Sequence, residues 1–175
     1  MDKKYKLTGE SIEVGGRKLY RIEALRDFSD IKAGDLGGFV ESYENLSHSG
    51  DCWVDNEGKV YEDAKVYGDA VVSGNAHVCG SARVFDQAFI YGSAAIYGEA
   101  SVFDDAVVCG NAEVYVEASV FDEAQVHGVA RVIGRAKVFG SSEVTGHAIV
   151  YGEASVFGDD VLNGNDRFCE ILGQC

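Results

Sequence analysis

The chain has 175 residues and a formal net charge of −14, with 29 Asp and Glu against 15 Lys and Arg. Hydrophobic residues make up 46% and charged residues 25%, the composition of a folded domain and not of a disordered one. Binding to a nucleic-acid backbone needs clustered Lys and Arg, so this charge argues against direct nucleic-acid binding. The sequence has neither an apolar run long enough to span a membrane nor the apolar core of a signal peptide, so we expect a cytoplasmic protein.

Residues 1–30 have the pattern of a small β-element. Three short segments alternate apolar and polar residues: 5–8, 11–14 and 18–23. Gly15 and Gly16 stand where a hairpin turn would lie. Because an uncovered strand edge promotes aggregation, we expect this hairpin to cap the open end of the domain that follows. Residues 31–53 are then expected to form an irregular first coil.

A six-residue repeat runs from Val60 through seventeen complete hexads without an insertion. Position one is Val in fifteen hexads and Ile in two, position five is Ala in fifteen, and position three is Gly in twelve and Asp in three. Positions five and one are two residues apart, so in an extended strand their small side chains face the same way, into a narrow tube. Gly or Asp at position three suits a corner with unusual backbone angles.

Each hexad therefore predicts one short strand and one corner, and three hexads make one coil. We predict an all-β fold: a single-stranded parallel β-helix of about six triangular coils over residues 31–165, an N-terminal β-hairpin cap over 1–30, and a short C-terminal cap over 166–175. Phe168, Ile171 and Leu172 have helical spacing, so the last segment is expected to form a cap or a short helix.

This pattern resembles the hexapeptide-repeat family, whose members form left-handed parallel β-helices and are usually homotrimers. More narrowly, residues 35–42 (DLGGFVES), 45–47 (NLS) and 52–54 (CWV) are similar to the YdcK-like branch. Proteins of that branch are common in bacteria and prophages and are often labelled as transferases. The resemblance therefore implies a left-handed helix and favours a trimer over a dimer.

Side chains at positions two and six point outward, and sorting them by eighteen residues gives three faces. One face carries an aromatic residue on every coil: Tyr67, Phe85, Phe103, Phe121, Phe139 and Phe157. A neighbouring face is rich in tyrosine and includes Tyr97 and Tyr115. Large apolar patches usually meet a partner, so we predict that these eight residues form an oligomer interface. Stacking of the rings on one another is the alternative explanation, and a ligand-binding strip is a third.

Acidic residues gather at the corner after the phenylalanine strand, among them Asp86, Asp104 and Asp122. Carboxylates stacked on adjacent coils could hold Ca²⁺, or they could imitate the phosphate row of a nucleic acid. The simpler interpretation is that Asp tolerates corner geometry and keeps the rod soluble. We expect no metal and no cofactor, and these three aspartates are the metal-site candidates.

The four histidines are scattered: His48, His77, His127 and His147. By resemblance, a hexapeptide-repeat acyltransferase uses a catalytic His beneath a loop that interrupts the coils, and no loop interrupts residues 54–165. His127, beside Cys109 and Tyr91, is the best-placed candidate base. The close histidine spacing that γ-type carbonic anhydrases use to bind zinc is missing. The sequence therefore favours a protein without catalytic activity.

The predicted function is binding by a non-catalytic homo-oligomer. Its first partner is a second copy of the chain, and a protein partner or a small nucleotide-like ligand stays open. We expect no direct contact with nucleic acid or membrane. The resemblance to prophage proteins suggests a role in binding or sequestering a component of host defence. Two alternatives are an acyltransferase-like enzyme with a site at the subunit interface and an acidic inhibitor that mimics DNA.

Overall fold

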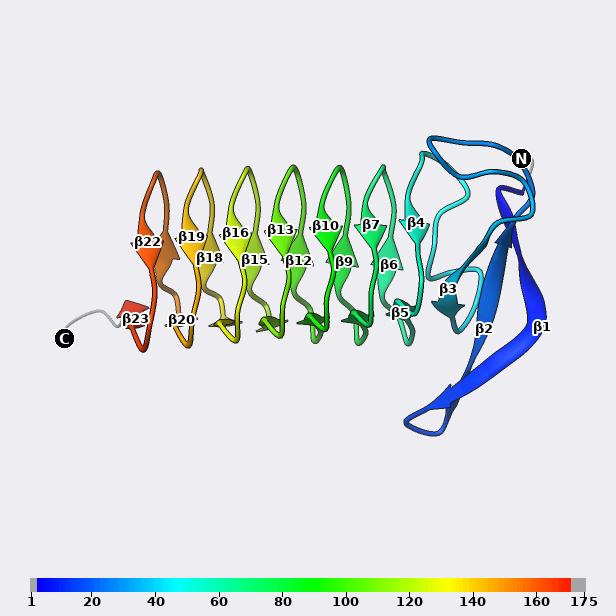
Figure 1. The fold of residues 1–175 in the computed structure, drawn as a ribbon. Helices are drawn as coiled ribbons and strands as arrows, with labels where there is room; N and C mark the ends of the chain where they lie inside the picture. The colour runs from blue at the N-terminus through cyan, green and yellow to red at the C-terminus, as the bar shows by residue number, and fades with distance from the viewer. Residues whose placement is uncertain (1–2, 171–175) are drawn as a thin grey trace.

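The computed structural model describes residues 3–170, which contain β-strands and no helix. Short parallel strands stack into a left-handed β-helix of about seven coils, and the N-terminal strands lie at one end of the rod (Figure 1). The predicted all-β fold is therefore confirmed, with one coil more than expected. Within the described residues, no helix of the length and apolar character needed to cross a membrane is present.

Three sheets form the three sides of the coils. The six-stranded sheet contains β6 (Lys65–Val66), β9 (Arg83–Val84), β12 (Ser101–Val102), β15 (Ser119–Val120), β18 (Lys137–Val138) and β21 (Ser155–Val156). The seven-stranded sheet contains β4 (Trp53–Val54), β7 (Val71–Val72), β10 (Phe89–Ile90), β13 (Val107–Val108), β16 (Gln125–Val126), β19 (Glu143–Val144) and β22 (Val161–Leu162). The ten-stranded sheet contains β1 (Tyr5–Val14), β2 (Arg17–Ala24), β3 (Leu36–Val40), β5 (Lys59–Val60), β8 (His77–Val78), β11 (Ala95–Ile96), β14 (Glu113–Val116), β17 (Arg131–Gly134), β20 (Ile149–Gly152) and β23 (Arg167–Glu170).

The pairing register shows where the first coil departs from the repeat. In the regular coils, paired residues are eighteen apart, as in Val54↔Val72. The pairs Val40↔Val60 and Leu46↔Val66 are instead twenty apart. Two extra residues therefore lie between Leu46 and Val54, so this coil departs from the eighteen-residue register.

The core is the column of side chains at positions one and five. Every Val, Ile and Ala at these positions between Val60 and Val156 is at most 2% exposed. Full burial of one such Val or Ile stabilises the fold by roughly 1.5–3 kcal/mol before chain entropy is counted. Ser142, which replaces Ala at position five, is also buried, and its hydroxyl donates to the Phe139 carbonyl at 2.9 Å.

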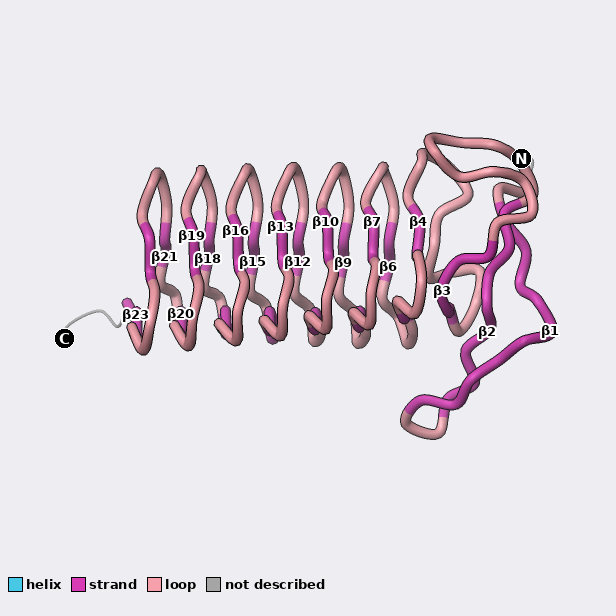
Figure 2. The backbone as a smooth tube through the Cα atoms, in the orientation of Figure 1, coloured by secondary structure: helices cyan, strands magenta, loops and turns pink. Residues whose placement is uncertain are grey.

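The corners require the left-handed backbone region at position three, and Figure 2 shows them as loops between the short strands. In the seventeen hexads from Val60, five non-glycine residues adopt this conformation at that position: Glu62, Asp86, Asp104, Val116 and Asp122. Gly74 illustrates why Gly is common there, because a Cβ would lie 2.8 Å from the Gly92 carbonyl oxygen. Corner carboxylates also accept from the next coil, since the Gly140 amide donates to Asp122 Oδ2 at 3.0 Å.

The N-terminal hairpin, β1 with β2, caps one end of the helix through β3, which is antiparallel to β2 and parallel to β5. Two buried side chains bond the open carbonyl groups of the first coil. Lys4 Nζ donates to the Cys52 carbonyl at 2.7 Å and to the Gly50 carbonyl at 3.1 Å. Tyr5 Oη donates to the Leu46 carbonyl at 2.9 Å. The predicted hairpin is confirmed. The groups that bond the carbonyls at this end are the ammonium of Lys4 and the phenol of Tyr5.

At the other end, β23 continues the parallel sheet by pairing Val150 with Phe168. The described part of the expected cap is therefore a strand and not a helix. Phe168 follows Leu162 by six residues, so it takes position one of a further hexad, and this frame prevails over the helical spacing. Ile171 and Leu172, on which the helical expectation also rested, lie outside the described residues.

Candidate functional site

The six predicted aromatic residues form one continuous stack on the six-stranded sheet, which we call the aromatic strip: Tyr67, Phe85, Phe103, Phe121, Phe139 and Phe157. Successive ring centroids lie 4.9, 4.9, 5.0, 4.9 and 5.6 Å apart. The first four pairs are within 4° of parallel, and the last pair is inclined by 19°. The stack arises because position two recurs every eighteen residues, so each ring lies directly on the ring of the coil before it.

Stacking covers the ring faces but leaves the ring edges outward. Strands pair about 4.8 Å apart, close to the 4.9–5.0 Å between the centroids of the first five rings, so the rings stack with an offset and their faces cover one another along the rod. Each ring pair contributes roughly 0.5–1.5 kcal/mol beyond area burial. Tyr67 remains 37% exposed and Phe157 55% exposed at the two ends, and the four central rings are half-buried. Ladder stacking therefore accounts for the faces and leaves an apolar surface made of ring edges.

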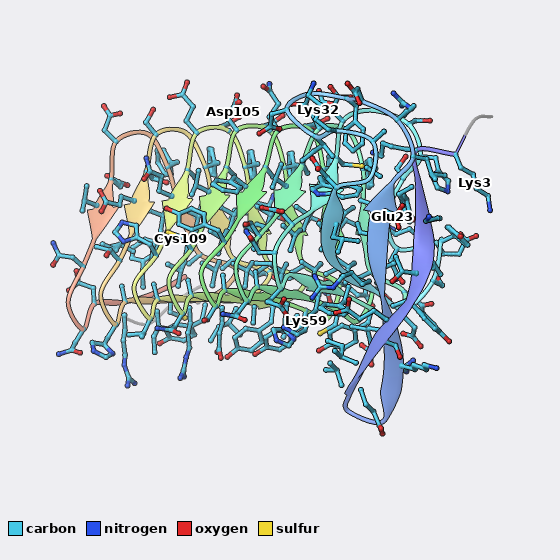
Figure 3. The ribbon with its side chains drawn as sticks, turned by 45° about the vertical axis from the view of Figure 1, so that its right-hand side comes forward. Lys3, Glu23, Lys32, Lys59, Asp105 and Cys109 are labelled. Carbon is cyan, nitrogen blue, oxygen red and sulfur yellow. The ribbon has the colours of Figure 1, made fainter. Side chains whose placement is uncertain are left out.

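The aromatic strip has opposite charges along its two sides. One side carries the position-six residues Lys65, Arg83, Ser101, Ser119, Lys137 and Ser155. The other side carries the corner carboxylates Asp69, Asp86, Asp104, Asp105, Asp122, Glu123 and Asp159. Asp105 projects outward from the corner in Figure 3. Lys65 lies 3.4 Å from Glu44, whereas Arg83 and Lys137 have no ion pair among the described residues.

Tyr97 and Tyr115 lie on the ten-stranded sheet, a different side of the rod from the aromatic strip. Their rings stack at 4.7 Å with an interplanar angle of 8°. Burial, together with the nearby Glu113 carboxylate, raises the pKa of Tyr97 to about 12. The structure therefore divides the eight predicted interface residues between two faces, six on one and two on the other.

His127 is hydrogen-bonded through both ring nitrogens. Its Nε2 lies 2.8 Å from Glu143 Oε1, and its Nδ1 lies 3.0 Å from Thr145 Oγ1. A His held between a carboxylate and a hydroxyl has the connectivity of a base with an orienting group. However, His127 lines neither the cavity at the cap nor the cavity near the C-terminal end that are described below. The candidate base therefore has an orienting carboxylate, and neither of these two cavities lies beside it.

The other histidines lie apart from His127. His48 accepts from the Lys4 backbone amide at 3.2 Å, so it belongs to the cap. His77 lies 3.5 Å from the Tyr61 hydroxyl, and burial lowers the pKa of His77, as does the charge of Lys59. Burial also lowers the pKa of His48. The structure thus leaves the histidines as scattered as the sequence predicted.

The candidate metal ligands Asp86, Asp104 and Asp122 lie one coil apart at a single corner, with φ between 55° and 57°. Asp104 Oδ2 accepts from the Asp122 backbone amide at 3.4 Å. Within residues 3–170, no three His, Cys, Asp or Glu side chains are grouped closely enough to hold a metal ion. All three aspartates adopt the left-handed corner conformation, and backbone amides donate to the carboxylates of Asp104 and Asp122.

A cavity of about 420 Å³ lies between the loop after β2 and the first coils. Its lining includes four carboxylates, Asp30, Asp51, Asp55 and Asp69, together with the aromatic side chains of Trp53 and Phe89. Trp53 is 2% exposed, and its Nε1 has no hydrogen-bond partner in the described chain. Sequence reasoning missed this cavity, because the loop that closes it lies outside the repeat. Carboxylates beside aromatic rings suit a positively charged group.

Comparison of the chain with protein-family models and with curated proteins found no match.

Proposed function

We propose that the protein is a non-catalytic, homo-oligomeric cytoplasmic β-helix that acts by binding, and that the aromatic strip is its self-association surface. The observation that carries this proposal is the unbroken six-ring stack whose edges face outward. A second copy of the chain is the partner that suits it, because both surfaces repeat at the same coil spacing. Ring edges of one copy can then lie between or against those of the other along the full length.

The charges on the two sides of the strip support one orientation of that second copy. When two strips face each other with parallel helix axes, the basic side of one copy lies opposite the acidic side of the other. With antiparallel axes, like charges lie opposite each other, which is unfavourable. We therefore propose parallel association.

Two symmetries satisfy this orientation, and they use different residues. A twofold dimer brings strip against strip, because both copies use the same patch. A trimer brings the strip of one copy against another face of the next copy. Tyr97 and Tyr115, stacked on the adjoining ten-stranded sheet, supply such a second face. The presence of stacked aromatic residues on two adjoining faces supports the trimer that the resemblance to hexapeptide-repeat proteins implies.

Native mass spectrometry of three variants tests the proposal. Phe103→Asp with Phe121→Asp places charges in the middle of the strip, so we expect a monomer. Tyr97→Asp with Tyr115→Asp should also give a monomer if the oligomer is a trimer, but should leave a dimer intact. As a matched control, Phe89→Asp with Tyr91→Asp alters a stacked, exposed pair on the third face, 4.7 Å apart. A wild-type monomer, or an unchanged oligomer in the strip variant, would refute the proposal.

We also propose a biological target for the oligomer. The resemblance to the YdcK-like branch supports a protein of bacteria or prophages that binds or sequesters a component of host defence. An acidic DNA mimic stays an alternative that the net charge of −14 supports. That alternative predicts salt-sensitive competition with DNA for a DNA-binding protein, lost when Asp86, Asp104 and Asp122 are neutralised.

An acyltransferase-like enzyme is the second candidate function, and the hydrogen-bonded set of His127, Glu143 and Thr145 is the observation that favours it. His127 lines neither of the two described cavities, which argues for binding instead, because acyl transfer needs a groove for the acyl donor. A bound acyl-CoA or nucleotide sugar, with its turnover lost in His127→Ala, would favour the enzyme.

A further inference from the structure

A second cavity, of about 540 Å³, lies near the C-terminal end of the ten-stranded sheet. Six residues line it: Val129, Arg131, His147, Ile149, Asn165 and Arg167. Its lining contains two guanidinium groups, an imidazole and an amide, and no carboxylate. A cavity of this kind is unexpected in a chain with a net charge of −14.

The repeat explains how these groups come together. Arg131 begins β17 and Arg167 begins β23, with Ile149 of β20 between them, and all three point outward at position six. His147 and Asn165 occupy position four of the corner that precedes these strands. Arg131 and Arg167 are two coils apart, so their backbones are separated by roughly 10 Å. Both arginines are exposed and long enough for the guanidinium groups to converge on one ligand.

The positive charge of this cavity is poorly compensated. Arg131 has one ion pair, with Glu113 at 3.4 Å, and both side chains are more than a third exposed. Such an exposed pair contributes little free energy. Among the side chains of residues 3–169, no carboxylate lies within ion-pair distance of Arg167. Arg135 differs, because it lies 3.2 Å from Glu117 and 3.3 Å from Glu153.

We propose that this cavity binds the diphosphate group of a small molecule. The planar guanidinium group matches phosphate oxygens with two parallel hydrogen bonds, so Arg131 and Arg167 each hold one of two adjacent phosphates. His147 and Asn165 supply further donors, and Val129 and Ile149 contact the apolar part of the molecule. A long nucleic acid would meet the surrounding carboxylates, whereas a small diphosphate fits within the cavity.

Isothermal titration calorimetry of the full chain with inorganic pyrophosphate tests this proposal, with orthophosphate as the comparison. We expect pyrophosphate to bind at least about tenfold more tightly than orthophosphate, since only pyrophosphate engages both arginines. Arg131→Ala and Arg167→Ala should each weaken pyrophosphate binding by about tenfold or more. Arg167→Lys should restore little of this affinity, because an ammonium group cannot form the paired hydrogen bonds.

Arg135→Ala is the matched control, because it removes the same charge at the corner directly after β17, where carboxylates already compensate the arginine. It should change pyrophosphate affinity by less than about twofold. Three results would overturn the proposal: no binding of pyrophosphate at millimolar concentration, equal weakening by Arg135→Ala, or full affinity in Arg167→Lys. Mass spectrometry of the strip variants tests the oligomer proposal separately.

Discussion

Val116 is the position-three residue at which side-chain chemistry and backbone conformation conflict most. Its φ is 67°, in the left-handed region, although Val is β-branched. The left-handed conformation costs an L-residue roughly 1–2 kcal/mol, whereas Gly adopts it freely. The Val116 side chain is 45% exposed, so it contributes little burial in return.

Val116→Gly is therefore expected to increase the free energy of unfolding by roughly 0.5–1 kcal/mol, once roughly 0.5–1 kcal/mol is subtracted for the greater entropy of unfolded Gly. The measurement is the denaturant midpoint of the variant against the wild type. Gly98→Val, one coil earlier, is the control and should lower the midpoint. There φ is 71°, and an added Cβ would lie 2.9 Å from the Val116 nitrogen. A variant less stable than the wild type would show that the Val116 side chain packs favourably at the corner.

At the scale of elements, the N-terminal cap differs from the coils in how its polar groups are satisfied. Each regular coil bonds its backbone groups to the next coil, but the first coil has no coil before it. Lys4, which is fully buried, donates to two of its carbonyl groups. Burial lowers the pKa of Lys4, while the neighbouring Cys52 opposes this shift. In the cap, the Lys4 ammonium group and the Tyr5 hydroxyl thus donate the hydrogen bonds that a preceding coil would supply.

Replacing Lys4 with Met keeps most of the side-chain length and removes both hydrogen bonds. Because the Cys52 carbonyl is then buried without a partner, we expect a loss of about 1–3 kcal/mol in the stability of this end. Hydrogen exchange should accelerate at residues 46–54 and stay unchanged in the central coils, since each coil contacts only its neighbours. Lys3→Met is the matched control, because Lys3 is exposed and lies over the Tyr43 ring. Equal acceleration along the whole rod would contradict a local role for Lys4.

The cap also shows how far sequence reasoning reaches. Alternating residues and the turn at Gly15 and Gly16 predict the hairpin, because strand alternation is a local property of the chain. The neighbouring residues do not predict that Lys4 bonds the carbonyls of the first coil, since Lys is almost always a surface residue. The C-terminal strand was missed for a related reason. Phe168 satisfies both a helical spacing and the hexad frame, and only pairing with β20 decides between them.

At the scale of the whole molecule, the repeat allows contacts between residues far apart in the sequence to be predicted. A period of eighteen residues predicts that Phe103 and Phe121 stack, because the register is constant along the coils. The same period shows which residues share a face, so the aromatic strip could be predicted in full. Both cavities were missed. One needs the loop outside the repeat, and the other depends on side chains at positions four and six that converge from different coils.

The proposed parallel association makes a prediction that cross-linking can test. A carbodiimide joins a lysine directly to a carboxylate, and Lys137 lies on the basic side of the strip. In an oligomer assembled from equal amounts of isotope-labelled and unlabelled chains, we expect cross-links between chains that join Lys137 to carboxylates at the same level of the rod. In a dimer these are Asp122 and Glu123, and in a trimer they are Glu117 and Glu153.

Antiparallel chains would give a different pattern. They would place Lys137 at the level of the first coils and beside basic residues, so cross-links to Asp69, or none between chains, would contradict parallel association. The expected result has an electrostatic cause, because opposite charges attract across an interface at short range and salt screens them. Raising the ionic strength should therefore weaken the preference for one orientation, whereas the ring-edge contacts, which carry no charge, should still hold the chains together.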